Sequence, residues 1–186
     1  TVSTIEAMIQ ENTKLIVTTH ASNLCGAVLP IEKIAQVAKK HGVYYLVDAA
    51  QSAGMLPIDV QKIGIDFLAC PGHKGLYGPT GTGILVVSRP EALSPVYAGG
   101  TGSNSKELTQ PAFSPDRFEC GTINTAGILG LEAGVDFVQR EGIDAICAHE
   151  TALLQRIYSR LKEMKKVTLY TPYPQYHKSA PVLMFN

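Results

Sequence analysis

One lysine, Lys74, stands in a glycine-rich turn, directly after Gly72-His73 and directly before Gly75. Glycine neighbours let a backbone turn tightly and approach a ligand closely. If such a lysine is buried, its neutral amine is favoured, and a neutral amine attacks aldehydes to form imines. Most lysines in glycine-rich turns are simply solvated, so this turn alone does not decide between the two readings.

A second chemical group, Asp48, follows the strand-like run from Tyr44 to Val47, and Gln51 lies three residues further on. A carboxylate in this position can hold a pyridine nitrogen protonated, which keeps the ring an electron sink. The alternative for Asp48 is a turn or helix-capping aspartate, and for Gln51 a side chain that faces solvent. Lys74 and Asp48 together therefore suggest imine chemistry on a pyridine cofactor.

An α/β chain is predicted to position these residues. Short apolar runs alternate with helical stretches up to residue 88, which is typical of a parallel sheet buried on both faces. Because ligands bind beyond the carboxyl ends of such strands, this edge is expected to gather Asn23, Asp48, Gln51, His73 and Lys74. The predicted strands are residues 14–18, 43–47, 66–69 and 83–87, and a helix follows Pro30 and closes at His41-Gly42.

The remainder of the chain has a different pattern. The stretch from Tyr97 to Pro115 is rich in Gly, Ser, Thr and Pro, which predicts a long and poorly ordered loop. Two helices are then expected, with one apolar stripe on the first, and two strands of a smaller unit follow. The helices cover residues 125–140 and 143–164, the stripe is Ile128, Leu131, Val135 and Val138, and the strands are 167–170 and 182–185.

Four sequence blocks occur in a fixed order: Thr-His-Ala-Ser-Asn at 19–23, Val-Asp-Ala-Ala-Gln at 47–51, Gly-His-Lys-Gly-Leu-Tyr-Gly-Pro at 72–79 and Arg-Phe-Glu-Cys-Gly-Thr-Ile-Asn at 117–124. In these blocks the chain resembles the class V aminotransferase family of pyridoxal-phosphate enzymes, in particular its branch of cysteine desulfurases and selenocysteine lyases. The resemblance implies a fold-type-I architecture. Residues 1–140 would form part of the cofactor-binding large domain, a mainly parallel sheet flanked by helices. Residues 141–186 would hold a connecting helix and the beginning of a small C-terminal α+β domain.

The resemblance also implies a role for individual residues. Lys74 would be the Schiff-base lysine, and Asp48 would pair with the pyridinium nitrogen. Gln51 and Asn23 would lie near the ring hydroxyl, with Asn23 also facing the substrate carboxylate.

Phosphate binding is implied for two further residues. His73 would help to hold the phosphate, and Thr122 would reach the phosphate of the cofactor in a partner subunit, which implies a homodimer with shared sites. Pro71 stands where the family often has a serine, so a phosphate-binding hydroxyl is missing and the phosphate must find other partners.

The activity implied by the resemblance is that of a cysteine desulfurase, which converts L-cysteine to L-alanine and leaves a persulfide on the enzyme. A sulfur-acceptor protein would then be a further partner. Family members are considerably longer, so we expect a fragment that is inactive alone, with the upstream phosphate loop, the stacking aromatic residue and the nucleophilic cysteine outside it. The alternatives are a selenocysteine lyase, an aminotransferase, or a catalytically silent domain retained for dimerisation or as a scaffold.

Composition excludes several other classes. The 16 basic and 16 acidic residues cancel, and no basic run occurs, so nucleic acid is not an expected partner. No apolar run reaches the ~18 residues that span a bilayer, and no secretory leader opens the chain, so we expect a cytoplasmic protein without membrane contact. A nicotinamide dehydrogenase is disfavoured because the glycines of residues 78–83 have the wrong spacing and precede a strand.

The cysteines and histidines have mainly structural interpretations. The four cysteines form neither a disulfide framework nor a metal site, so no metal is expected, and Cys25, Cys70 and Cys120 are interpreted as small buried thiols. For His20 a hydrogen-bonded structural role is favoured over one at the border of the cofactor site. His149 is expected to be exposed.

Overall fold

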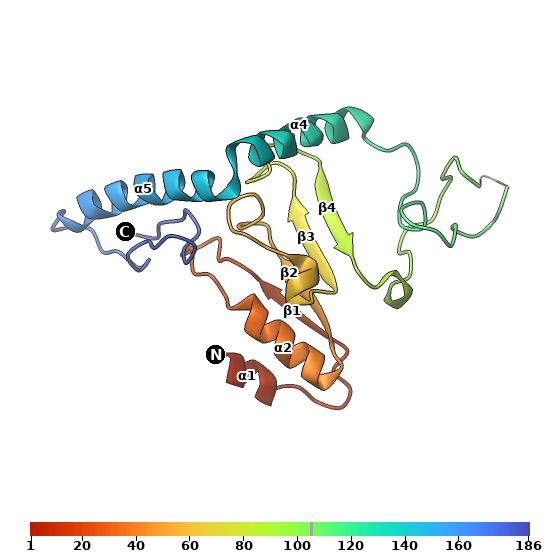
Figure 1. Ribbon diagram of the computed structural model, residues 1–186, viewed down its shortest axis with the longest axis horizontal. Helices are drawn as coiled ribbons and strands as arrows, with labels where there is room; N and C mark the ends of the chain where they lie inside the picture. Colours follow the sequence, from red (N-terminus) through yellow and green to blue (C-terminus); the bar gives the residue numbers. More distant parts are fainter. Residues whose placement is uncertain (105) are drawn as a thin grey trace.

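A four-stranded sheet lies at the centre of the chain, in the order β1-β2-β3-β4 (Figure 1). The computed structural model describes residues 1–104 and 106–186. The strands are β1 (Leu15–Thr19), β2 (Tyr44–Asp48), β3 (Phe67–Pro71) and β4 (Gly83–Val87). The helices are α1 (Val2–Ala7), α2 (Ile31–His41), α3 (Val60–Ile63), α4 (Thr125–Glu141) and α5 (Ile143–Lys162), with a 3-10 turn at Pro90–Ala92.

The first three strands are parallel, and β4 returns antiparallel to β3. In this register Asp48 lies between Thr19 and Ala69, while Pro71 pairs with Gly83. The carboxyl ends of β1, β2 and β3 and the start of β4 therefore meet at one edge. The prediction of a mainly parallel sheet flanked by helices is confirmed.

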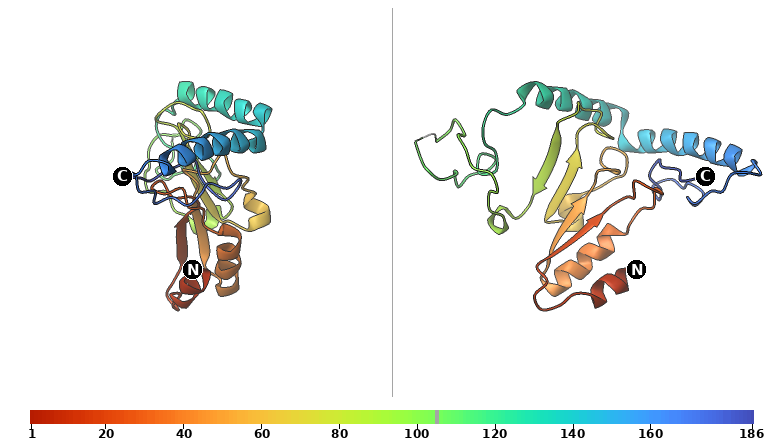
Figure 2. Two further views of the ribbon diagram at one scale, coloured as in Figure 1. Left: turned by 90° about the vertical axis from the view of Figure 1, so that its left-hand side faces the viewer. Right: turned by 180° about the vertical axis from the view of Figure 1, so that it is seen from behind.

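Helix α2 covers one face of the sheet (Figure 2). Its apolar residues recur at helical spacing, and Ile31, Ile34 and Ala38 pack in one core with Tyr45 and Val47. Gly42 ends the helix in the left-handed conformation with φ 65°, which a residue without a side chain adopts at no steric cost. The helix and its end at His41-Gly42 agree with the prediction.

The other face of the sheet is largely open in the described residues. Val17 is 59 % exposed and Leu85 is 54 % exposed, and Leu15 and Tyr44 are exposed beside them. The expectation of a sheet buried on both faces is therefore wrong for these residues, because the helices gather on one face and along the carboxyl edge.

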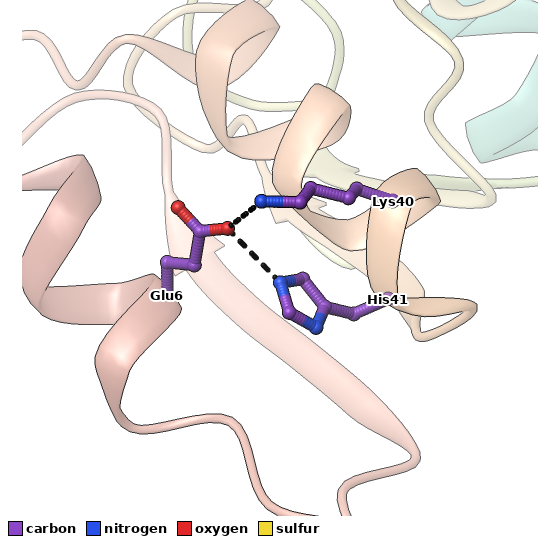
Figure 3. A network of polar contacts seen from close by, with 3 residues as sticks. All are labelled: Glu6, Lys40 and His41. Carbon is purple, nitrogen blue, oxygen red and sulfur yellow. Dashed lines mark hydrogen bonds and ion pairs between the residues drawn. The ribbon is translucent and has the colours of Figure 1, made fainter.

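Three polar side chains connect α1 to the end of α2 (Figure 3). The Oε1 atom of Glu6 lies 2.7 Å from Nζ of Lys40 and 3.0 Å from Nε2 of His41. Hydrogen bonds from Lys40 and then from His41 lower the pKa of Glu6 below its ordinary value. This contact therefore stabilises the fold above the ordinary glutamate pKa and is lost as the pH falls through the lowered pKa.

Helix α4 runs across the end of β3 and β4, and α5 continues from it away from the sheet (Figure 1). The buried positions of α4 are Gly127, Leu131, Gly134 and Val138, so the predicted stripe is correct for Leu131 and Val138. It is wrong for Ile128, which is 49 % exposed. On the helix surface, Ile128 lies about a quarter turn away from the line of these four buried residues. The two glycines on that line let the helix backbone approach the loop after β3, so this line and not Ile128 faces the core.

The C-terminal segment pairs more sparsely than predicted. The two strands expected at 167–170 and 182–185 reduce to a single bridge between Leu169 and Phe185. A second contact takes the segment back to the turn after β1, where Ser179 bridges Ala27 and the Ala180 amide donates to the Gly26 carbonyl at 2.8 Å. The division into residues 1–140 and 141–186 stays a prediction.

The stretch predicted as a long loop has neither helix nor strand between residues 97–104 and 106–115. Residue 105, which belongs to that prediction, lies outside the described residues. Among the helices of residues 1–104 and 106–186, none has the length and apolar character that crossing a membrane requires.

Candidate functional site

Three loops emerge at the carboxyl edge of the sheet, after β1, β2 and β3. Asp48 is the last residue of β2, and its side chain is exposed. One carboxylate oxygen accepts the Ala50 amide at 2.8 Å, and the Asp48 carbonyl accepts the His20 amide at 2.8 Å. Local hydrogen bonds thus hold this carboxylate at the strand end, and its second oxygen has no hydrogen-bond donor among the described residues.

The loop after β2 is built from small residues that pack closely. Ala49 and Ser52 are completely buried, and the Ala53 amide donates to the Ala49 carbonyl at 2.9 Å. Gly54 has φ 80°, and a Cβ atom there would overlap the Gly75 carbonyl. The backbone of this loop therefore touches the backbone beside Lys74.

The loop after β3 carries His73 and Lys74 and is closed by its own backbone. The Gly72 amide donates to the Thr82 carbonyl, and the Gly78 amide donates to the Gly72 carbonyl, both at 2.8 Å. His73 and Lys74 are exposed within this closed loop. The backbone of this loop is therefore held by hydrogen bonds, and the imidazole of His73 and the amine of Lys74 are consecutive side chains on it.

Tyr77, three residues after Lys74, has a strained backbone with φ 55°. Its amide donates to the Lys74 carbonyl at 2.9 Å, and its ring lies edge-on to that of Phe137, with the ring centroids 4.9 Å apart. A bulky residue in the left-handed region costs free energy and persists only where packing enforces it. Neither aromatic residue was predicted to belong to the site, because the sequence carries no signal of positive φ at a tyrosine.

Helix α4 supports this loop through a glycine. A Cβ atom on Gly134 would overlap the Leu76 carbonyl and meet the Gly78 amide nitrogen at 3.0 Å. A side chain at this position would push the helix away from the loop. Gly134 is therefore required for the close approach of α4 to the backbone beside Lys74.

We expect Gly134→Ala to destabilise the full-length protein by about 1–3 kcal/mol, because overpacking outweighs the gain in helix propensity of ~1 kcal/mol. Denaturant unfolding measures this change. Gly130→Ala in the same helix is the matched control, since its Cβ would meet only the Pro79 ring, at 3.1 Å and beyond. Equal stabilities for the two variants would contradict the packing argument.

The structure brings only some of the predicted residues together. Gln51 and Lys74 line one pocket of about 90 Å³. Asn23 is exposed in the turn after β1, a turn held by Ser22, whose Oγ accepts the Leu24 amide at 3.2 Å. Thr122 is exposed in the segment before α4. Asp48, His73, Asn23 and Thr122 do not line this pocket.

The same pocket has two wall residues that sequence analysis missed, Tyr77 and Glu150. Glu150 lies on α5, three and four residues after the buried Cys147 and Ile146. That spacing places it near the buried face of the helix. The sequence signal for Glu150 was an acidic residue at helical spacing from apolar residues that are expected to be buried.

The cysteines and histidines follow the structural interpretation with three corrections. All four cysteines are free, and burial raises the pKa of the Cys70 thiol, whereas the Ser22 hydrogen bond lowers that of Cys25. Cys25 is only partly buried and Cys120 is exposed, because both lie in irregular segments outside the core. His20 is buried, but the expected hydrogen bond is not found at its Nδ1, which has no partner among the described residues, and burial lowers its pKa. His149 is exposed, as predicted.

Comparison with known proteins identifies the family of this chain. The family model for class-V aminotransferases matches residues 1–186. The chain belongs to the class V aminotransferase family. Among the relatives of this class V chain, a probable cysteine desulfurase of Halalkalibacterium halodurans is 40 % identical over 186 residues, and a cysteine desulfurase of Yersinia pestis is 39 % identical over 190 residues.

Solved structures of proteins named cysteine desulfurases agree with these relatives. A cysteine desulfurase from Thermococcus onnurineus superimposes with a TM-score of 0.86 at 37 % identity, and one from Escherichia coli with 0.84 at 26 % identity. Both are matched over 100 % of this chain but only 46 % of their own. The H. halodurans and Y. pestis proteins are matched over 98 % and 100 % of this chain and 45 % and 46 % of their own. The class V chain thus spans about half the length of the relatives it matches.

Proposed function

We propose that the whole protein is a pyridoxal-phosphate-dependent cysteine desulfurase, and that this chain contributes the part of its active site that carries Lys74. The observation that carries the proposal is the junction of two loops at the carboxyl edge. The Gln51 loop and the Lys74 loop touch through Gly54 and Gly75, directly beyond the strand that ends in Asp48. The names of the relatives, cysteine desulfurases in both comparisons, support the choice of substrate.

The side chains at this edge fit the proposed cofactor in chemical type. Lys74 supplies an amine for an aldehyde, and the carboxylate oxygen of Asp48 that has no donor among the described residues would accept from a protonated ring nitrogen. Gln51 and Asn23 offer amide groups for a ring hydroxyl, and His73 offers an imidazole for the phosphate. Pro71 has neither a hydroxyl nor an N–H, so the phosphate must rely on other donors.

When bound, pyridoxal phosphate supplies an electron-accepting ring that stabilises negative charge on the α-carbon of an amino acid. The chain's own residues then have separate tasks. Asp48 would hold the proton on the ring nitrogen, and Lys74 would tether the cofactor and exchange protons with the substrate. Asn23 would orient the substrate carboxylate.

The overall reaction proposed for the whole protein takes L-cysteine to L-alanine and transfers the sulfur to a cysteine thiol as a persulfide. None of the four cysteines of this chain is proposed as that thiol, since Cys70 and Cys147 are buried and the other two lie away from the pocket beside Lys74. A sulfur-acceptor protein would then take the sulfur, and we place the reaction in the cytoplasm.

A homodimer is part of the proposal. Thr122 is exposed and does not line the pocket beside Lys74, which agrees with a role at the phosphate of a partner subunit's cofactor. The segment that carries it lies beside the sheet and not on it, as Figure 1 shows for residues 106–124.

The test uses the full-length protein with pyridoxal phosphate. We expect a visible absorbance band that borohydride removes, a reduced adduct that peptide mapping places on Lys74, and alanine formed from L-cysteine. Alanine from selenocysteine but not from cysteine would favour a selenocysteine lyase, and amino-group transfer to a keto acid would favour an aminotransferase. Absence of any adduct would favour a silent dimerisation or scaffold domain.

A further inference from the structure

The turn after β1, which carries Asn23, is closed by its own hydrogen bonds. The Gly26 amide donates to the Ser22 carbonyl at 3.1 Å, and the Ser22 amide donates to the Ala27 carbonyl at 2.9 Å. The Oγ atom of Ser22 also accepts the Cys25 amide at 3.3 Å. Asn23 is exposed inside this closed turn, so the position of its side chain depends on where the turn as a whole is held.

The C-terminal segment holds this turn from outside, at Gly26 and Ala27. The Ala180 amide donates to the Gly26 carbonyl at 2.8 Å, and Ser179 pairs with Ala27 in an isolated antiparallel bridge. Ala180 is completely buried. Because a hydrogen bond in a protein interior is electrostatically stronger than one in water, this junction fixes the turn more firmly than an exposed contact would.

Gly26 is the residue that makes this junction possible. Its φ is 68°, in the left-handed region, and a Cβ atom on it would lie 2.6 Å from the Ala180 carbonyl oxygen and 3.0 Å from that of Val182. Both oxygens belong to the backbone, which cannot turn aside as the end of a flexible side chain can. A side chain at position 26 would therefore push the C-terminal segment away from the turn.

A small buried cluster extends from this junction to the loop after β2 and to α5. Its members are Ala21, Met55, Leu56, Cys147 and Ala180. Met55 and Pro181 also line the pocket beside Lys74. Since Pro181 directly follows Ala180, one dipeptide of the C-terminal segment contacts the turn of Asn23 and borders the pocket beside Lys74.

We propose that Gly26 is a positioning residue for the substrate: its carbonyl accepts the Ala180 amide and its missing side chain leaves room for the C-terminal segment, which thereby holds Asn23 in place for the substrate carboxylate. This inference rests on the proposed function, in which Asn23 orients the carboxylate of L-cysteine. It assigns to residues 179–182 an influence on substrate affinity that acts through the turn after β1.

In the full-length protein with pyridoxal phosphate, Gly26→Ala is expected to raise the KM for L-cysteine about tenfold, the scale of one lost hydrogen bond to a charged group. A rise in KM at constant kcat is the result of losing an interaction that binds substrate and transition state equally. The adduct on Lys74 should form normally, because the loop that carries it is closed by backbone bonds of Gly72 and Gly78. Alanine formation gives KM and kcat, and visible absorbance of the same sample gives the adduct.

Gly42→Ala is the matched control. Gly42 also has a left-handed φ, 65°, but a Cβ atom there would meet nothing within 4 Å among the described residues. This variant therefore carries the backbone cost of Gly26→Ala without its clash, and its KM should be unchanged. Ala180→Pro is a second route to the expected effect, since proline lacks the N–H that donates to the Gly26 carbonyl.

A double variant distinguishes this positioning role from a general loss of structure. Asn23→Ala alone should raise KM at least as much as Gly26→Ala does. In the Asn23→Ala background, Gly26→Ala should add no further increase, because two substitutions that act through the same side chain are not additive. A purely structural effect of Gly26→Ala would add to that of Asn23→Ala. Circular dichroism verifies the fold of each variant.

The outcomes separate this inference from the proposed function. A raised KM in Gly26→Ala or Ala180→Pro that adds nothing in the Asn23→Ala background, with Gly42→Ala unchanged, supports it; if one of the first two variants fails to fold, the other decides. An unchanged KM in a folded variant, an increase that persists without Asn23, or an unchanged KM in Asn23→Ala overturns it. Failure of the unsubstituted protein to form an adduct on Lys74 overturns the proposed function itself.

Discussion

Replacing Lys74 with alanine is expected to abolish the covalent adduct with pyridoxal phosphate and all turnover of L-cysteine in the full-length protein. The amine is the only group of this side chain that bonds to an aldehyde. The fold should be preserved, because Lys74 is exposed and the loop around it is closed by backbone hydrogen bonds of Gly72 and Gly78. Visible absorbance before and after borohydride, together with circular dichroism, measures both effects.

Lys62→Ala is the matched control for this variant. Lys62 is exposed on α3, and its contact to Asp59 uses its backbone amide, so truncation of the side chain leaves that contact in place. We expect normal adduct formation in Lys62→Ala. If the absorbance band persisted in Lys74→Ala, another lysine would carry the cofactor and the site assignment would be wrong.

Asp48→Asn is expected to leave cofactor attachment possible but to lower the turnover of L-cysteine by on the order of 10²-fold or more, the scale seen when a preorganised electrostatic partner is removed. Asparagine keeps an oxygen that accepts the Ala50 amide, so the turn after β2 is retained. It lacks the negative charge that would hold a proton on the ring nitrogen. Adduct absorbance and the rate of alanine formation, measured on the same sample, separate binding from chemistry.

Asp136→Asn provides the comparison, since Asp136 is exposed on α4. That variant should retain both adduct formation and turnover. Full activity of Asp48→Asn would remove Asp48 from its proposed role. Loss of cofactor attachment in Asp48→Asn would instead assign the carboxylate a part in binding.

Most of the secondary structure followed from local patterns. The β4 prediction, residues 83–87, agrees with the observed strand at both ends, and the other three strands agree within one or two residues. Such agreement is expected where a short apolar run is bounded by glycine or by a charged residue. The open face of the sheet was not predictable in this way, since an apolar run indicates burial but does not say what covers it.

The sequence by itself determined the chemistry available to this protein. The four blocks identified the family, which the comparison over residues 1–186 confirmed. The order of strands and turns placed Asp48 and Lys74 at the carboxyl edge, because parallel strands end on the same side of a sheet. These conclusions needed only residue types and their spacing along the chain.

Only the tertiary structure decided which groups meet. Contacts between residues distant in sequence depend on how closely two backbones approach, and Gly54 with Gly75 and Gly134 with Leu76 fix those approaches by lacking side chains. The same packing turned Ile128 away from the buried line of α4 and brought Glu150 to the pocket of Lys74. Periodicity places a residue on a helix face, whereas the partner of that face is set by the packing of the whole chain.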